Sequence, residues 1–247
     1  MMNKKYLNLY LIFFLIFLFG TFSNSFAQNK RFVAILPFPN TGSVDFDWVS
    51  RGIEEILYDK MENLSSIQVF EKETLVRILN ENGVKSESDL TVRKAFAVGK
   101  DTGADVLIAG SYEVNGNNLI VKFRVVSTYT GADVFNDTYQ DNVENIFGLF
   151  ENAILETMNV MVISVPEEER QMLARSATNS ISAFRNYCKA YTEFQRGASM
   201  ETVAALFNSA IQEDPNFWEA QYNLGVIYFN FNQYSKAINQ FEIVSGS

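Results

Sequence analysis

The chain changes its pattern at Pro166, and this change limits the possible folds more than any other feature. Residues 30–165 alternate between strand-like and helix-like stretches, whereas residues 167–247 carry no strand pattern. Pro166 suits the first turn of a helix, and the three glutamates after it suit the positive end of a helix dipole. We therefore predict an α/β domain over 28–165, a linker or helix over 166–180 and an all-α region over 181–247.

The first 27 residues have the three parts of a secretory signal peptide. Lys4 and Lys5 precede an apolar run at 7–20, and Ser25 and Ala27 supply small residues before a cleavage point at Gln28. The run is shorter than the roughly 20 residues that a spanning helix needs. We predict an exported protein with no membrane span after cleavage, and an uncleaved anchor stays open as the alternative.

Composition excludes several classes of chemistry. The chain has no His, which excludes catalytic triads with an imidazole and His-ligated zinc or haem. Its one Cys, Cys188, excludes an internal disulfide, a Cys₄ zinc site and a lipid-accepting cysteine at the cleavage point. A net charge of −9 argues against a nucleic-acid partner. We expect no cofactor and no metal.

Periodicity predicts the order β-α-β-α-α-β-β-β-α for the first domain, which is a mixed sheet with helices packed on it. The clearest local signal is the Asn115-Gly116-Asn117-Asn118 hairpin turn. The strands are expected at 32–38, 67–70, 105–112, 119–126 and 132–139, and the helices at 48–61, 71–80, 90–102 and 142–165.

Several of these segments resemble one family. VAILPF at 33–38, IQVFEK at 67–72 and the long segment at 103–135 are similar, in order and spacing, to the TolB amino-terminal-like domain, which is related to CsgG-like envelope proteins. The resemblance covers residues 31–160. It implies an α/β domain of the cell envelope that works by protein contacts, with no catalytic residues. The chain lacks the lengthy alternating hairpins of CsgG-type pores, which argues against pore formation.

The second region resembles tetratricopeptide repeats, in which about 34 residues form two helices. Five residues fall at the consensus offsets of one repeat, and the same offsets 34 residues earlier hold a weaker match. These two sets are Leu224, Gly225, Tyr228, Ala237 and Phe241, and Ala190, Tyr191, Phe194, Val203 and Phe207. The resemblance implies about two repeats, the last incomplete. We expect that the chain continues, or that a partner or the first domain covers the end of the array.

Four residues form the candidate protein-binding surface. Glu219, Tyr222, Val226 and Phe229 recur at helical spacing on the first helix of the second repeat. Such repeats turn this face toward ligands, and aromatic residues are enriched at binding hot spots. The alternative is that the aromatic residues serve only for packing.

Other polar groups have simpler interpretations. Gly99-Lys100-Asp101-Thr102 resembles the end of a phosphate-binding loop, but a helix end explains it better because Asp101 stands where that loop needs Ser or Thr. The carboxylates at 45, 47, 54 and 55 could serve a hydrolase or a calcium site, and capping or a solvated surface is the alternative. Cys188 is expected to be a small core residue, with a reactive thiol as the alternative.

These features together predict a non-enzymatic scaffold or adaptor in the envelope of a bacterium, periplasmic or outer-membrane-associated. It would bind protein or peptide partners through the repeats and the TolB-like domain. The alternative is an accessory component of an outer-membrane secretion or assembly apparatus related to CsgG, oligomerising through the first domain. The sequence identifies neither the partner nor the oligomeric state.

Overall fold

The computed structural model describes residues 30–246. The predicted signal peptide at 1–27 lies outside these residues. The first region contains β1 (Arg31–Ile35), α2 (Trp48–Glu62), β2 (Ile67–Val69), α3 (Lys72–Glu81), α4 (Val92–Thr102), β3 (Val106–Asn115), β4 (Asn118–Ser127), β5 (Asp133–Asn142) and α5 (Ile146–Val160). The second contains α6 (Glu167–Leu173), α7 (Ile181–Gln195), α8 (Met200–Glu213), α9 (Trp218–Asn230) and α10 (Tyr234–Ser245). Within the described part of the chain, no helix combines the length and apolar character needed to cross a membrane.

The five strands form one mixed sheet, as the sequence predicts. Their order is β2-β1-β3-β4-β5, with β1 parallel to β2 and β3, and with β3, β4 and β5 antiparallel. The predicted hairpin turn joins β3 to β4, where Asn115 pairs with Asn118. Gly116 in this turn has a φ of +64°, a conformation that glycine adopts without strain.

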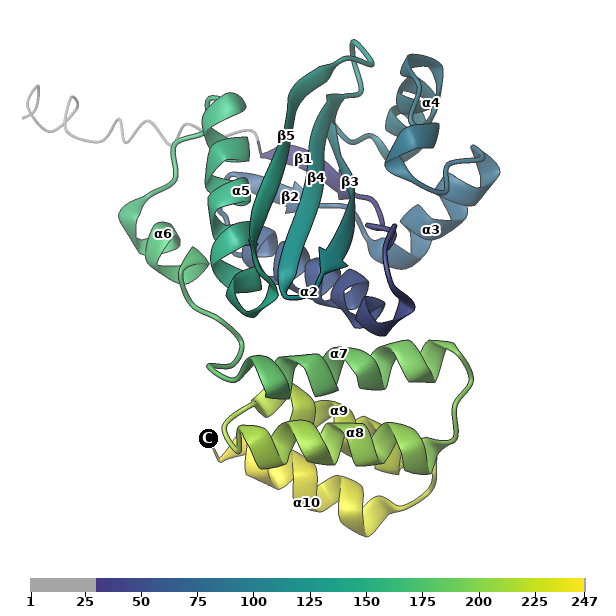
Figure 1. The fold of residues 1–247 in the computed structure, drawn as a ribbon, viewed down its shortest axis with the longest axis vertical. Helices are drawn as coiled ribbons and strands as arrows, with labels where there is room; N and C mark the ends of the chain where they lie inside the picture. Colours follow the sequence, from purple (N-terminus) through teal and green to yellow (C-terminus); the bar gives the residue numbers. More distant parts are fainter. Residues whose placement is uncertain (1–29, 247) are drawn as a thin grey trace, which may run out of the picture.

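Each face of the sheet carries two helices, and the alternation of side chains along β1 and the residue after it shows why. Val33 and Ile35 point into the larger core under α2 and α5, whereas Ala34 and Leu36 point into the smaller core under α3 and α4. Figure 1 shows the two helix layers on opposite sides of the strands. A sheet covered on both faces needs apolar residues on both sides of its central strands, which is why β1 is almost continuously apolar.

Both predicted ends of the last helix in the first region are wrong. The sequence pattern predicts a helix over 142–165, but α5 occupies only Ile146–Val160. At its start, Asn142 still pairs with Asn118 as the last residue of β5, so the backbone is extended there. At its end, Val162 adopts a φ of +57°, which breaks the helical path. The apolar periodicity that extends past the helix therefore does not mark its ends.

The second region folds as two antiparallel helix pairs, α7 with α8 and α9 with α10, as predicted for the helical repeats. In the second pair, Leu224 of α9 and Ala237 of α10 are buried. Gly225 lets these helices approach, since a Cβ there would lie 2.6 Å from the ring of Phe241. In the first pair, Ala190 and Val203 are fully buried. The fold class predicted from the sequence is thus confirmed in both regions.

The two regions share one hydrophobic core. Helix α7 lies along α2, on the side of α2 that faces away from the sheet (Figure 1). Gly52 of α2 makes the approach close, because a Cβ there would lie 3.0 Å from the ring of Phe184 and 3.7 Å from the sulfur of Cys188. The buried cluster that begins at Val33 continues through this contact to Leu224. Helix α2 is therefore packed between the sheet and the first helix pair.

Candidate protein-binding surface

The four predicted binding residues all lie on α9 and differ in how far they are buried. Glu219 is half-buried and lines a cavity against α2. Val226 is half-buried in a shallow groove beside Tyr191. Tyr222 and Phe229 are exposed, each with about half of its area accessible. Their spacing keeps the four residues within one sector of α9, and that they form a single binding surface stays a prediction.

Tyr222 and Phe229 belong to a larger apolar surface on the second helix pair. The ring of Tyr222 lies 5.7 Å from that of Phe241, and the ring of Phe229 lies 5.6 Å from that of Tyr234. Ile238 lies one turn after Tyr234 on α10 and is also about half exposed, so it extends this surface. We call the following set the α9–α10 surface: Tyr222, Phe229, Tyr234 and Ile238.

In the first pair, aromatic residues of α7 are covered by α2. The guanidinium of Arg51 lies 4.0 Å from the centre of the Tyr191 ring and forms ion pairs with Glu54 and Glu55. The hydroxyl of Tyr187 donates a hydrogen bond to Glu55 at 3.1 Å. Burial, with the nearby Glu55 carboxylate, raises the pKa of Tyr187 far above its usual value, so the phenol stays neutral. This side of α7 is therefore occupied from within the chain.

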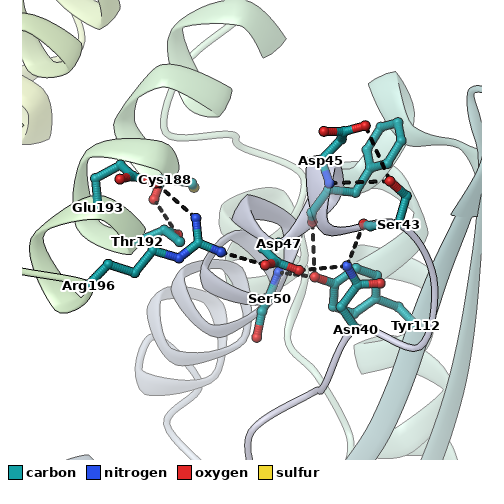
Figure 2. Close-up of polar contacts among 11 residues, drawn as sticks. Asn40, Ser43, Asp45, Asp47, Ser50, Tyr112, Cys188, Thr192, Glu193 and Arg196 are labelled. Carbon is teal, nitrogen blue, oxygen red and sulfur yellow. Dashed lines mark hydrogen bonds and ion pairs between the residues drawn. The ribbon is translucent and has the colours of Figure 1, made fainter. Parts of the chain in front are cut away.

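A polar network fixes the other end of the α2–α7 contact (Figure 2). The Asp47 carboxylate accepts hydrogen bonds from Asn40 at 2.7 Å and from Arg196, at the end of α7, at 2.5 Å. The hydroxyl of Tyr112 accepts from the Ser50 N–H at 3.0 Å. These bonds join the loop after β1, the start of α2, strand β3 and the end of α7.

The carboxylates considered for hydrolysis or calcium have other partners. Asp45 contacts Ser43, and Glu54 forms an ion pair with Lys72 at 2.5 Å. Asp47 occupies the N-cap position of α2 without a capping bond, so it bonds across the interface to Arg196 instead of capping the helix. Among the described residues, no group of His, Cys, Asp and Glu side chains could hold a metal ion.

The remaining two candidates lie in packed positions. Gly99 and Thr102 belong to α4, and a Cβ at Gly99 would collide with Thr128 at 2.3 Å, so this glycine serves close packing instead of a phosphate loop. Cys188 is fully buried in the α2–α7 contact. Burial raises the pKa of its thiol well above the usual value, which is typical of an inert core cysteine.

The family comparison agrees with the second repeat. Residues 206–239 match the family model of the tetratricopeptide repeat. This segment runs from within α8 through α9 into α10. The matched segment does not reach residues 31–160. The match therefore does not support the resemblance of those residues to TolB and CsgG domains. No curated protein matches the chain.

Several solved structures are similar to part of this chain at low identity. The LpoB C-terminal domain from Salmonella enterica is 14% identical with a TM-score of 0.36, covering 46% of this chain and 84% of that one. Lipoprotein GNA1162 from Neisseria meningitidis is 14% identical with a TM-score of 0.40, and the match covers 53% of this chain and 97% of that one. A PelC dodecamer from Paraburkholderia phytofirmans is 15% identical with a TM-score of 0.31, covering 46% and 73%.

Proposed function

We propose that this protein is a non-enzymatic adaptor of the bacterial cell envelope that binds a protein partner through the α9–α10 surface. The observation that carries the proposal is this exposed apolar surface on the helix pair that matches the tetratricopeptide repeat model. Contiguous apolar surface rimmed by polar residues is typical of a protein–protein contact. The predicted signal peptide supports export.

The α/β domain would serve as the fixed support of this surface. It buries one side of the first helix pair against α2, whereas the second pair keeps exposed apolar side chains. A rigid support lowers the entropy cost of binding, because the helices are already ordered before the partner arrives.

Site-specific photo-crosslinking in the envelope tests the proposal. A photoreactive phenylalanine analogue replaces Tyr222 or Phe229, and a matched control carries it at Phe96, an exposed aromatic residue of α4. We expect one discrete crosslinked product from positions 222 and 229 that is absent from position 96. The proposal is wrong if all three positions give the same products, or if Ile238→Asp leaves the products from position 222 unchanged.

A mass measurement by light scattering separates the adaptor from the secretion-apparatus alternative. We expect the purified protein to be a monomer or a dimer. A ring of many subunits would favour an assembly component that oligomerises through the first domain.

A further inference from the structure

A cavity of about 300 Å³ lies where the two regions meet. Its walls come from α2, from Phe147 of α5, from the segment 175–177, from α7 and from the start of α9. This volume is about twice the roughly 150 Å³ of a cavity that holds benzene. Ligand sites occur preferentially at such junctions between domains. The protein-binding role proposed above does not use this cavity.

Aromatic rings form much of the wall. Phe147 packs against Phe184 with ring centres 4.7 Å apart, and Tyr187 packs against Phe217 at 4.9 Å. Trp218 also lines the cavity and is half-exposed, so one of its sides is open to solvent. Such a wall suits an aliphatic stem, and an aromatic face also attracts a cation.

The charged groups of the cavity are mostly acidic. Four carboxylates line it, and the two cations there are Lys60 and Arg175. The four are Glu55, Asp59, Glu62 and Glu219. The Lys60 ammonium donates hydrogen bonds to the backbone carbonyls of Leu173 and Arg175, so two of its donors are already used.

Glu219 is the carboxylate whose environment is least compensated. One of its carboxylate oxygens is buried and has no hydrogen-bond partner among the described residues. Burial, together with the nearby Asp59, Glu55 and Asp214 carboxylates, raises the pKa of Glu219 to about 7. Burial also raises the pKa of Asp59, an effect that Lys60 opposes. Carboxylates held together in this way are stabilised by a cation that enters between them.

We propose that this cavity binds an ammonium or guanidinium group on an aliphatic stem, carried either by a free amine or by a basic side chain of a bound protein. The cation would lie against Glu219 and Asp59, and the stem against the aromatic wall. The charged group and the stem of the ligand thereby each contact groups of matching chemistry. An alcohol of the same length would match only the aromatic wall.

Calorimetry on the purified full-length protein tests the cavity directly. The small probes are n-butylamine and n-butylguanidine, with n-butanol as the neutral control. We expect both cations to bind at least ten times more tightly than n-butanol. Equal affinity of n-butanol and n-butylamine, or no binding of either cation at 10 mM, would overturn the proposal.

Two pentapeptides distinguish the sources of the cation. They are Gly-Gly-Lys-Gly-Gly and the matched Gly-Gly-Met-Gly-Gly. If the lysine peptide binds and the methionine peptide does not, a basic side chain reaches the cavity. Binding of n-butylamine without the lysine peptide supports a free amine as the ligand. Both results support the cation site, and neither depends on the α9–α10 surface.

Variants locate the binding and exclude a folding defect. Glu219→Gln keeps the size of the side chain and removes the charge, and it should weaken amine binding at least tenfold at pH 8. Asp59→Asn should weaken it in the same direction. Glu213→Gln is the matched control, because Glu213 is exposed at the end of α8 and does not line the cavity. Unchanged affinity in both cavity variants, each with a normal melting curve, would refute the site.

The affinity of the cavity for a cation should rise with pH. Between pH 6 and pH 8 the amine stays charged, while Glu219 loses its proton. The cation should therefore bind up to about tenfold more tightly at pH 8 than at pH 6. The other groups near Glu219 are Asp59, Glu55 and Asp214, with Lys60 and Arg175 on the cavity wall. A similar pH dependence in Glu219→Gln would assign the effect to one of these and contradict the role of Glu219.

Discussion

The two helix pairs share one architecture, yet they differ in what covers their aromatic residues. Phe184 of the first pair is 1% exposed, because α2 and α5 enclose it, whereas Phe229 of the second pair is 56% exposed. The first pair has become part of the core of the α/β domain. The second pair rests on the first and keeps an apolar surface. Aromatic residues on the first helix of each pair thus stabilise the fold in one pair and remain available for contact in the other.

The largest expected difference comes from truncating one aromatic side chain in each pair. Phe184→Ala should lower the free energy of unfolding by about 3–5 kcal/mol, because it leaves a cavity in the shared core. Phe229→Ala should change it by less than about 0.5 kcal/mol. Urea denaturation measures both. Equal losses would show that the second pair is as firmly packed as the first.

Alanine in place of a helical glycine tests the closeness of packing within and between the regions. Gly225→Ala should cost about 1–3 kcal/mol, because its Cβ overlaps the Phe241 ring at 2.6 Å. Gly52→Ala should be nearly neutral, since the 3.0 Å contact with Phe184 is milder and alanine favours the helix by about 1 kcal/mol.

Hydrogen exchange completes this test. Gly225→Ala should speed exchange in α10 and leave α7 unchanged. If both helices exchange faster, the two pairs unfold as one unit and the comparison between them fails.

Removing the charge of Glu219 should stabilise the protein at high pH. Its folded pKa, about 7, lies above the unfolded value of 4.5, so the folded state binds more protons between these values and stability falls as the pH rises through them. Because the side chain is only half-buried, solvent screening limits the effect to about 1–2 kcal/mol. Glu219→Gln should therefore raise the free energy of unfolding by this amount at pH 8 and leave it unchanged at pH 4. Thermal unfolding at the two pH values measures it, with Glu213→Gln expected to show no such gain.

The smallest effect is expected at the exposed end of the α2–α7 contact. Arg196→Ala removes the ion pair with Asp47, but such pairs at the surface contribute little and are screened by salt. Chemical denaturation should not resolve the change. A clear loss of stability that disappears at high salt would show that this pair helps to hold the two regions together.

Much of the architecture could be predicted from local signals. The Asn-Gly turn fixes the β3–β4 hairpin, since only a few residues adopt the required backbone angles. The change of pattern at Pro166 marks where strands stop. The offsets of Leu224, Gly225 and Phe241 place the second helix pair, because small and large residues must alternate where two helices touch. Helix ends were harder to predict, as α5 shows, since the apolar pattern extends past the backbone hydrogen bonds.

The candidate site depended on the tertiary structure. The sequence by itself determined that Glu219, Tyr222, Val226 and Phe229 lie on one helix, because helical spacing is a local property. It could not determine that α2 would lie against α7 and place Glu219 beside Asp59, since these residues are far apart along the chain. That arrangement arises from apolar burial, which is non-directional and is settled only when all the faces of the chain have been packed.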